Sequence, residues 1–140
     1  MQTDLARIMS VSGQHGLYRY VAQARGGAIG ENLATGQRKV FSTTSRISTL
    51  ADIAIYTSEG EMKLDEVFLA LKNVLGDADA PSPKASDKEL ADLFGKAIPN
   101  YDPDRFYVSH MRKVVGWYDE IAKYASFDFV KEEQGDAPQD

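Results

Sequence analysis

Residues 16–43, GLYRYVAQARGGAIGENLATGQRKVFST, decide the fold class of this 140-residue chain. Over residues 16–24 the side chains alternate between two sets, which is the two-residue period of a β-strand. Arg25-Gly26-Gly27 follows as a hairpin turn, because glycine adopts positive φ without steric cost. Residues 28–33 and 38–43 predict two further strands, joined by a second glycine-containing turn. This part of the chain therefore predicts a small antiparallel sheet.

The flanking segments add a fourth strand and a helix. Residues 3–9 suggest a short amphipathic helical turn, and residues 52–58, DIAIYTS, alternate as a fourth strand of the sheet. Such a small sheet must curl into a barrel or pack on a helix. Residues 64–75 supply that helix, with Gly76 placed to end it. Its apolar stripe consists of Leu64, Val67, Phe68, Leu71, Val74 and Leu75.

The second half of the chain predicts two helices, at residues 87–98 and about 109–125. Ser86 begins a capping box for the first of these helices, and Pro99 ends it. Ser109 is the expected N-cap of the second helix. Four aromatic residues in and beyond the connector form either a small core for these helices, the favoured interpretation, or a protein-binding patch. They are Tyr101, Phe106, Tyr107 and Trp117.

The predicted fold class is α+β, with a small curled antiparallel sheet or SH3-like barrel packed with one helix, followed by a C-terminal helical hairpin. The proline-bearing segment DADAPSPKA marks the expected module boundary. The resulting layout has a β-rich module at 1–76, a linker at 77–86, a helical hairpin at 87–126 and a disordered acidic tail at 127–140.

Composition favours a soluble cytoplasmic protein. Apolar residues make up 43% of the chain and charged residues 26%, and cysteine is absent, so a thiolate metal site is excluded. No run of residues approaches the length of a membrane span, and the N-terminus does not resemble a signal peptide. Net charge is −5, but residues 1–60 carry six basic and four acidic residues, whereas residues 61–140 carry ten and seventeen. This asymmetry also suggests two modules.

No motif indicates catalysis, a cofactor or a metal. The two histidines, His15 and His110, lack the neighbouring ligands that a metal site needs, so structural or exposed roles are expected. Asp102 and Asp104 begin a D-x-D pattern, but the later positions of a calcium loop are absent. Serine residues lie in turns and caps, without a nucleophile elbow. The expectation is that the protein is not an enzyme.

One cluster combines basic and aromatic residues on the predicted strands. Its members, the candidate binding surface, are Tyr18, Arg19, Tyr20, Arg25, Arg38 and Lys39. On a curled sheet, tyrosines could stack on bases while arginines meet phosphates, so RNA is one candidate partner. The stronger alternative is that the tyrosines fill the core and the arginines face solvent. A DNA-reading helix-turn-helix is excluded, because the connector between the last two helices is about ten residues long.

Three groups of segments carry a resemblance: Ser12-Gly13-Gln14-His15-Gly16-Leu17-Tyr18, residues 50–57 with 64–68, and residues 87–90 through 99–102 to Trp117-Tyr118. In these segments the chain resembles an uncharacterised family of small Bacteroidetes proteins. The resemblance implies an N-terminal and a C-terminal domain of unknown function in a bacterial cytoplasm. Family members often have Lys-Pro where this chain has Gln14-His15, which argues against a shared role for His15. The resemblance implies no activity.

The function expected from the sequence is a non-enzymatic interaction module that binds an unknown protein partner through aromatic surfaces or a strand edge. Nucleic-acid binding, with RNA as the ligand, is the alternative. No membrane, metal or cofactor is expected to take part.

Overall fold

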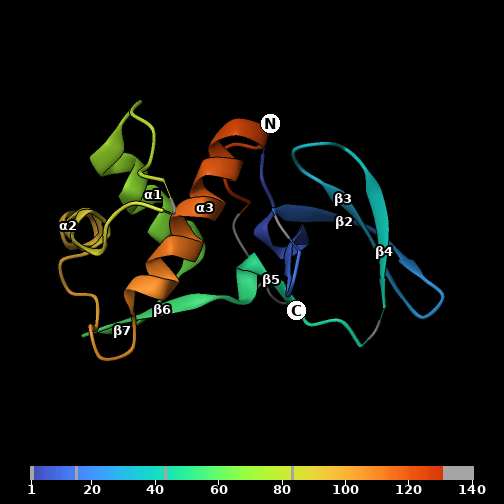
Figure 1. Cartoon of the computed structure of the whole chain (residues 1–140), viewed down its shortest axis with the longest axis horizontal. Helices are drawn as coiled ribbons and strands as arrows, with labels where there is room; N and C mark the ends of the chain where they lie inside the picture. The colour runs from blue at the N-terminus through green and yellow to red at the C-terminus, as the bar shows by residue number, and fades with distance from the viewer. Residues whose placement is uncertain (1, 15, 43, 83, 131–140) are drawn as a thin grey trace, which may run out of the picture.

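The computed structural model of the chain describes residues 2–14, 16–42, 44–82 and 84–130. Within these residues the fold is α+β, with a five-stranded antiparallel sheet, a two-stranded sheet and three α-helices. Figure 1 shows β2, β3 and β4 projecting to one side of the molecule, with the helices gathered on the other side. The elements in chain order are η1 (Leu5–Arg7), β1 (Ile8–Val11), β2 (Leu17–Ala24), β3 (Gly27–Asn32), β4 (Arg38–Ser42), β5 (Ile47–Thr49), η2 (Leu50–Asp52), β6 (Ala54–Thr57), β7 (Gly60–Lys63), α1 (Leu64–Leu75), α2 (Asp87–Ala97) and α3 (Val108–Tyr124).

The five-stranded sheet has the order β4-β3-β2-β1-β5, so β4 and β5 are its edges among the described residues and no closed barrel forms. The three strands expected at residues 16–43 are present as β2, β3 and β4. The expected fourth strand, residues 52–58, does not join this sheet. It contributes β6, which pairs with β7 in a separate two-stranded sheet and forms an isolated antiparallel bridge from Thr57 to Tyr101. The SH3-like barrel is therefore not the architecture.

Strand β1, which lies between β2 and β5, replaces much of the helical turn that was expected at residues 3–9. Only Leu5–Arg7 form a short 3-10 helix, and the chain is extended from Ile8 onward. Ile8 is buried on one face of the sheet, whereas Met9 and Val11 are buried on the other. A strand that is buried on both faces lacks the alternation of apolar and polar residues. The spacing of its apolar residues can therefore be mistaken for that of a helix.

The helices and one face of the strands share the main hydrophobic core. Leu5, Ile8, Leu17 and Leu50 from the N-terminal part join the same buried cluster as the apolar stripes of the three helices. Helix α1 packs against α2 and against β7, so it belongs with the helical half of the molecule and does not cap only the strands. The Pro-bearing segment between α1 and α2 is consequently an external loop within one packed unit.

The stripe of α1 is buried at Leu64, Val67, Phe68 and Leu71, whereas Val74 is 38% exposed. Gly76 ends α1 with φ +60, and its N–H donates to the Lys72 carbonyl at 2.8 Å. Glycine tolerates this positive φ, which explains the helix end. The expected bounds of this helix are confirmed.

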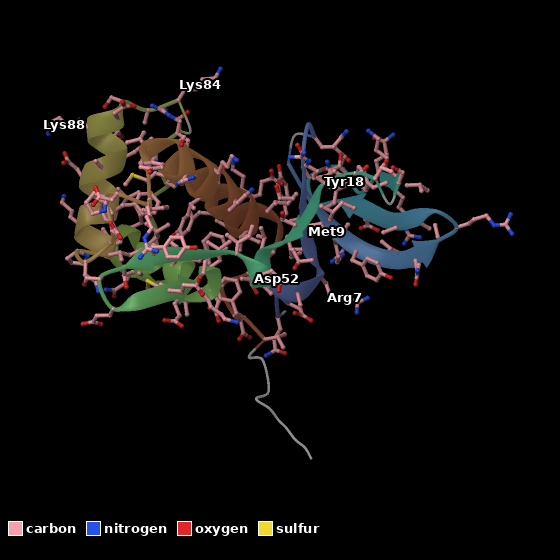
Figure 2. The ribbon with its side chains drawn as sticks, turned by 90° about the horizontal axis from the view of Figure 1, so that it is seen from below. Arg7, Met9, Tyr18, Asp52, Lys84 and Lys88 are labelled. Carbon is pink, nitrogen blue, oxygen red and sulfur yellow. The ribbon has the colours of Figure 1, made fainter. Side chains whose placement is uncertain are left out.

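Helices α2 and α3 are joined by residues 98–107. Ser86 Oγ accepts a hydrogen bond from the Glu89 N–H at 3.1 Å, which is the cap expected for α2. In Figures 1 and 2, α2 runs across the direction of α3, so the two helices cross steeply and do not form an antiparallel hairpin. Helix α3 also begins earlier than expected, because Tyr107 and not Ser109 is its N-cap.

The two ends of the described chain pair with each other. The Thr3 N–H donates to the Asp128 carbonyl at 2.8 Å, and the Val130 N–H donates to the Thr3 carbonyl at 2.9 Å. Phe129 is buried, with its ring centroid 6.0 Å from that of Phe68. Residues 127–130 are thus part of the fold, which differs from the disordered tail expected from residue 127. The rest of that expected tail, 131–140, lies outside the described residues.

Candidate functional site

The candidate binding surface expected at β2 and β4 is divided between the two faces of the sheet. Residues that pair across antiparallel strands lie on the same face. The registers Arg19↔Glu31 and Glu31↔Arg38 place both arginines on one face. Tyr18, Tyr20 and Lys39 lie on the opposite face, and the exposed Arg25 lies at the tip of the β2–β3 hairpin. The six residues therefore do not form a single surface.

Both arginines of that first face bind the carboxylate of Glu31. Arg19 Nη2 lies 2.9 Å from Glu31 Oε2, and Arg38 Nε lies 3.3 Å from Glu31 Oε1. The hydrogen bond from Arg19 and then that from Arg38 hold the pKa of Glu31 below its usual value. Each guanidinium thus has a carboxylate partner within the sheet, which lowers its availability to a phosphate.

On the opposite face, Tyr18 is buried in a small second core with Met9, Val11 and Phe41. The rings of Tyr18 and Phe41 meet edge to face with centroids 4.8 Å apart. Lys39 Nζ lies 6.0 Å from the Phe41 ring centroid and donates to Gln14 Oε1 at 3.1 Å. Figure 2 shows Met9 and Tyr18 close together at the base of the projecting strands. Tyr18 is a buried core residue, and it borders a small cavity of about 180 Å³ that is also lined by Asn32, Gln37, Arg38 and Lys39.

Within the described part of the chain, no strand pairs with the outer side of β4, which is therefore a free edge. Asn32 donates its N–H to the Gln37 carbonyl at 2.9 Å, in the same register as the β3–β4 pairs. Because hydrogen-bonded pairs recur at every second residue of an antiparallel ladder, Lys39 and Phe41 bond to β3. The backbone N–H and C=O groups of Arg38 and Val40 consequently point to the free side of β4. Val40 is also 58% exposed, the largest fraction among the exposed large apolar side chains.

The surroundings of this edge are positively charged. Residues 16–49 contain five basic residues and one acidic residue, a net charge of +4 in a chain whose total is −5. The basic residues are Arg19, Arg25, Arg38, Lys39 and Arg46. Charged side chains on an edge strand are a common protection against pairing with identical copies. They also favour an acidic partner.

The four aromatic residues around the last two helices are mainly core residues. Phe106 is buried, and its ring meets those of Phe94 and Tyr101 edge to face at centroid separations of 5.3 and 5.7 Å. Tyr101 and Trp117 pack against the main core and are half-buried. Tyr107 is the exception, because it is 54% exposed, although its hydroxyl donates to the Asp104 carbonyl at 2.6 Å.

His110 has a structural role. Its Nδ1 accepts a hydrogen bond from the Tyr107 N–H at 3.0 Å and so satisfies a backbone donor at the start of α3. His15 lies outside the described residues. Among the residues that the structure describes, no group of three or more metal-ligating side chains comes together.

A cleft of about 700 Å³ lies between α3 and the N-terminal strands. Its wall on one side is formed by residues 10–14 and 16 with Arg46, Ser48 and Ile53, and on the other side by α3. The α3 residues are Arg112, Lys113, Gly116, Trp117 and Glu120. Neither Arg46 nor the cleft itself was expected from the sequence, because strand β5 and its position opposite α3 depend on long-range pairing.

Glu120 forms part of the α3 wall of this cleft. Its Oε1 accepts a hydrogen bond from the Leu17 N–H at 3.1 Å, and the side chain is half-buried. Desolvation raises the pKa of Glu120, an effect that the Leu17 hydrogen bond partly offsets. Gly16 adopts φ +81 beside this carboxylate, and a Cβ atom at this position would lie 3.1 Å from Glu120 Oε2. The glycine thus permits both the turn and the close approach.

Two family models match the chain in succession. A domain of unknown function (DUF5606) matches residues 5–50, and a second domain of unknown function (DUF6852) matches residues 53–121. The border between the two matches falls at η2, not at the expected linker 77–86. No curated protein matches the chain.

A solution NMR structure of a protein from Bacteroides vulgatus is similar to this chain. The two share 32% sequence identity with a TM-score of 0.76, over 89% of this chain and 91% of the other. Among the helices of the described residues, none has the length and apolar character needed to cross a membrane. The chain belongs to the family in which these two domains of unknown function occur together.

Proposed function

We propose that this protein is a non-enzymatic interaction module that binds an extended acidic segment of another protein along the free edge of β4. The observation that supports this proposal is the outward direction of the Arg38 and Val40 backbone groups on an exposed edge strand. An extended peptide can add a strand to such an edge through main-chain hydrogen bonds.

The chemistry of the partner follows from the charge around the edge. The net charge of +4 over residues 16–49 favours acidic side chains in the partner. The exposed Val40 side chain favours a small apolar residue beside them, because alternate side chains of an added strand face the same side of the sheet. The chain's lack of cysteine is consistent with action in the cytoplasm.

Binding at the main-chain edge of β4 needs no catalytic side chain, since the edge supplies two donors and two acceptors at a fixed spacing.

The test uses a pair of substitutions at one position. Proline at position 40 removes the outward N–H of β4 but no hydrogen bond to β3, because proline is tolerated on the solvent side of an edge strand. Val40→Thr keeps the N–H and the β-branched shape. Both variants and the wild type are compared by direct binding to peptides selected from a displayed library of extended sequences.

We expect acidic peptides to be selected by the wild type, bound about equally by Val40→Thr, and bound at least tenfold more weakly by Val40→Pro. Equal binding by the two variants would contradict the proposal. Preferential binding of oligonucleotides, with a steep loss of affinity in salt and on Arg19→Ala or Arg25→Ala, would also contradict it and favour RNA.

A further inference from the structure

We propose that the cleft between α3 and the N-terminal strands binds a small organic anion in which a phosphate or carboxylate group is joined to a flat ring. This site is separate from the β4 edge and does not depend on the function proposed there. Its volume of about 700 Å³ lies within the range of small-molecule sites.

The anionic group of the ligand is recognised by two cations from opposite walls. Arg46 comes from the DUF5606 part and Lys113 from the DUF6852 part, and both line the cleft. Within the part of the chain that the structure describes, neither side chain forms an ion pair. Arg112 differs, because its guanidinium binds the Asp87 carboxylate and the Ala85 carbonyl. Two cations that have no carboxylate partner among the described residues therefore line one cleft.

The middle of the α3 wall suits a flat apolar body. Trp117 lines the cleft as a half-buried ring, and neighbouring Gly116 has no side chain to fill the space beside it. Indole rings provide large apolar contact area and stack on flat ligands. The proposed ligand therefore combines a flat ring with its anionic group.

The far part of the wall carries Glu120, seven residues after Lys113 on α3. Seven residues correspond to about 10 Å along a helix axis, so cation and carboxylate lie about two turns apart on the cleft side. Glu120 Oε1 is already occupied by the Leu17 N–H. The position of Glu120 sets the orientation of the ligand in the cleft, because the anionic group is attracted to Lys113 and repelled from the Glu120 carboxylate.

The chain contains a built-in reporter for this proposal. Trp117 is the only tryptophan, so tryptophan emission comes entirely from the cleft wall. The probes are AMP, adenosine and inorganic phosphate, with excitation at the red edge of the indole absorption where AMP does not absorb. Adenosine lacks the anion and phosphate lacks the ring, so the three probes separate the two parts of the recognition.

We expect AMP to change Trp117 emission saturably and to bind at least tenfold more tightly than adenosine or phosphate. Arg46→Ala and Lys113→Ala should each weaken AMP about tenfold, whereas Lys84→Ala should have no effect. Lys84 is an exposed lysine that lies in Figure 2 at the helical end of the molecule, away from the projecting strands. Circular dichroism of each variant verifies that it is folded.

The proposal is contradicted if AMP does not change the emission saturably, or if AMP binding survives the double substitution of Arg46 and Lys113 to alanine. Equal affinity for AMP and adenosine would likewise overturn it, because the two cations would then have no part in binding. Calorimetry with the same probes repeats the measurement without dependence on Trp117.

Discussion

Glu120 Oε1 accepts a hydrogen bond from the Leu17 N–H at 3.1 Å, which connects two residues that are 103 positions apart. Leu17 begins β2 and is fully buried, while Glu120 lies in the last two turns of α3. This contact joins the first family domain to the second at the cleft. It also places a half-buried carboxylate where its charge is disfavoured.

The pKa of Glu120 is raised by burial, and this predicts the direction of its effect on stability. The folded state holds the proton more tightly than the unfolded state, so the free energy of unfolding falls as pH rises from about 4.5 through the folded pKa. At lower pH the Glu120 carboxyl is protonated in both the folded and the unfolded state, so this loss of stability is absent. Glu120→Gln keeps an oxygen acceptor for Leu17 but cannot ionise. Urea unfolding at several pH values should therefore show the variant gaining stability over the wild type as pH rises.

Glu120→Ala is the matched variant for the hydrogen bond. It leaves the buried Leu17 N–H without its partner, so we expect a loss of about 1–3 kcal/mol in the free energy of unfolding. If alanine and glutamine variants are equally stable at neutral pH, the Leu17–Glu120 hydrogen bond contributes nothing and the interpretation is wrong.

Gly30 is predicted to be essential for the second core. A Cβ atom here would lie 2.9 Å from Met9 Cε, 3.1 Å from Phe41 Cε2 and 3.1 Å from Tyr18 Cβ. Gly30→Ala should cost about 1–3 kcal/mol, since overpacking forces neighbouring side chains from their rotamers. The control is Gly95→Ala in α2, where a Cβ atom meets nothing within 4 Å. This second change should stabilise the protein by about 1 kcal/mol. A loss at both sites would contradict the packing described for Gly30.

The paired chain ends are predicted to contribute to stability. Phe129→Ala removes a buried ring that contacts Phe68 and Phe127, so it should lower the free energy of unfolding by about 3–5 kcal/mol. Val130→Ala is the control, because Val130 is 41% exposed and should change stability by less than about 0.5 kcal/mol. Chemical unfolding of both variants distinguishes a packed end from a loosely attached one. Equal stability of the two variants would indicate that Phe129 is not part of the core.

His110 is predicted to act as a cap. Its Nδ1 accepts from the Tyr107 N–H, so His110→Ala should lower the free energy of unfolding by about 1 kcal/mol. Zinc should leave the melting temperature of the wild type unchanged, since a ligand that binds the native state would raise it. A zinc-dependent rise that His110→Ala abolishes would instead assign this histidine to a metal site.

Local signals in the sequence predict the helices better than the sheet. The bounds of α1 follow from its apolar stripe and Gly76, both of which act within a few residues. Strand β5 has three residues, too few for an alternation to be recognised, and β1 is buried on both faces. The sequence places the module boundary in the proline-bearing loop before α2, whereas the two family-model matches meet near η2.

The candidate sites show the same limit. Alternation along β2 already places Tyr18 and Arg19 on opposite faces, but the pairing of both arginines with Glu31 needed the strand register. The edge position of β4 depends on the strand order, which follows from the long-range pairing of β1 with β2 and β5. The cleft also depends on long-range pairing, because Arg46 and Lys113 are far apart in the sequence and line the same cleft only in the folded chain.

Amide hydrogen exchange of residues 38–41, with and without a selected acidic peptide, tests the proposed strand edge most directly. We expect the Lys39 and Phe41 amides to be protected in both states, because they bond to β3. The Arg38 and Val40 amides should exchange freely in the unbound protein and become protected when the peptide is bound. Unchanged exchange at Arg38 and Val40 in a saturated complex would contradict peptide addition at β4.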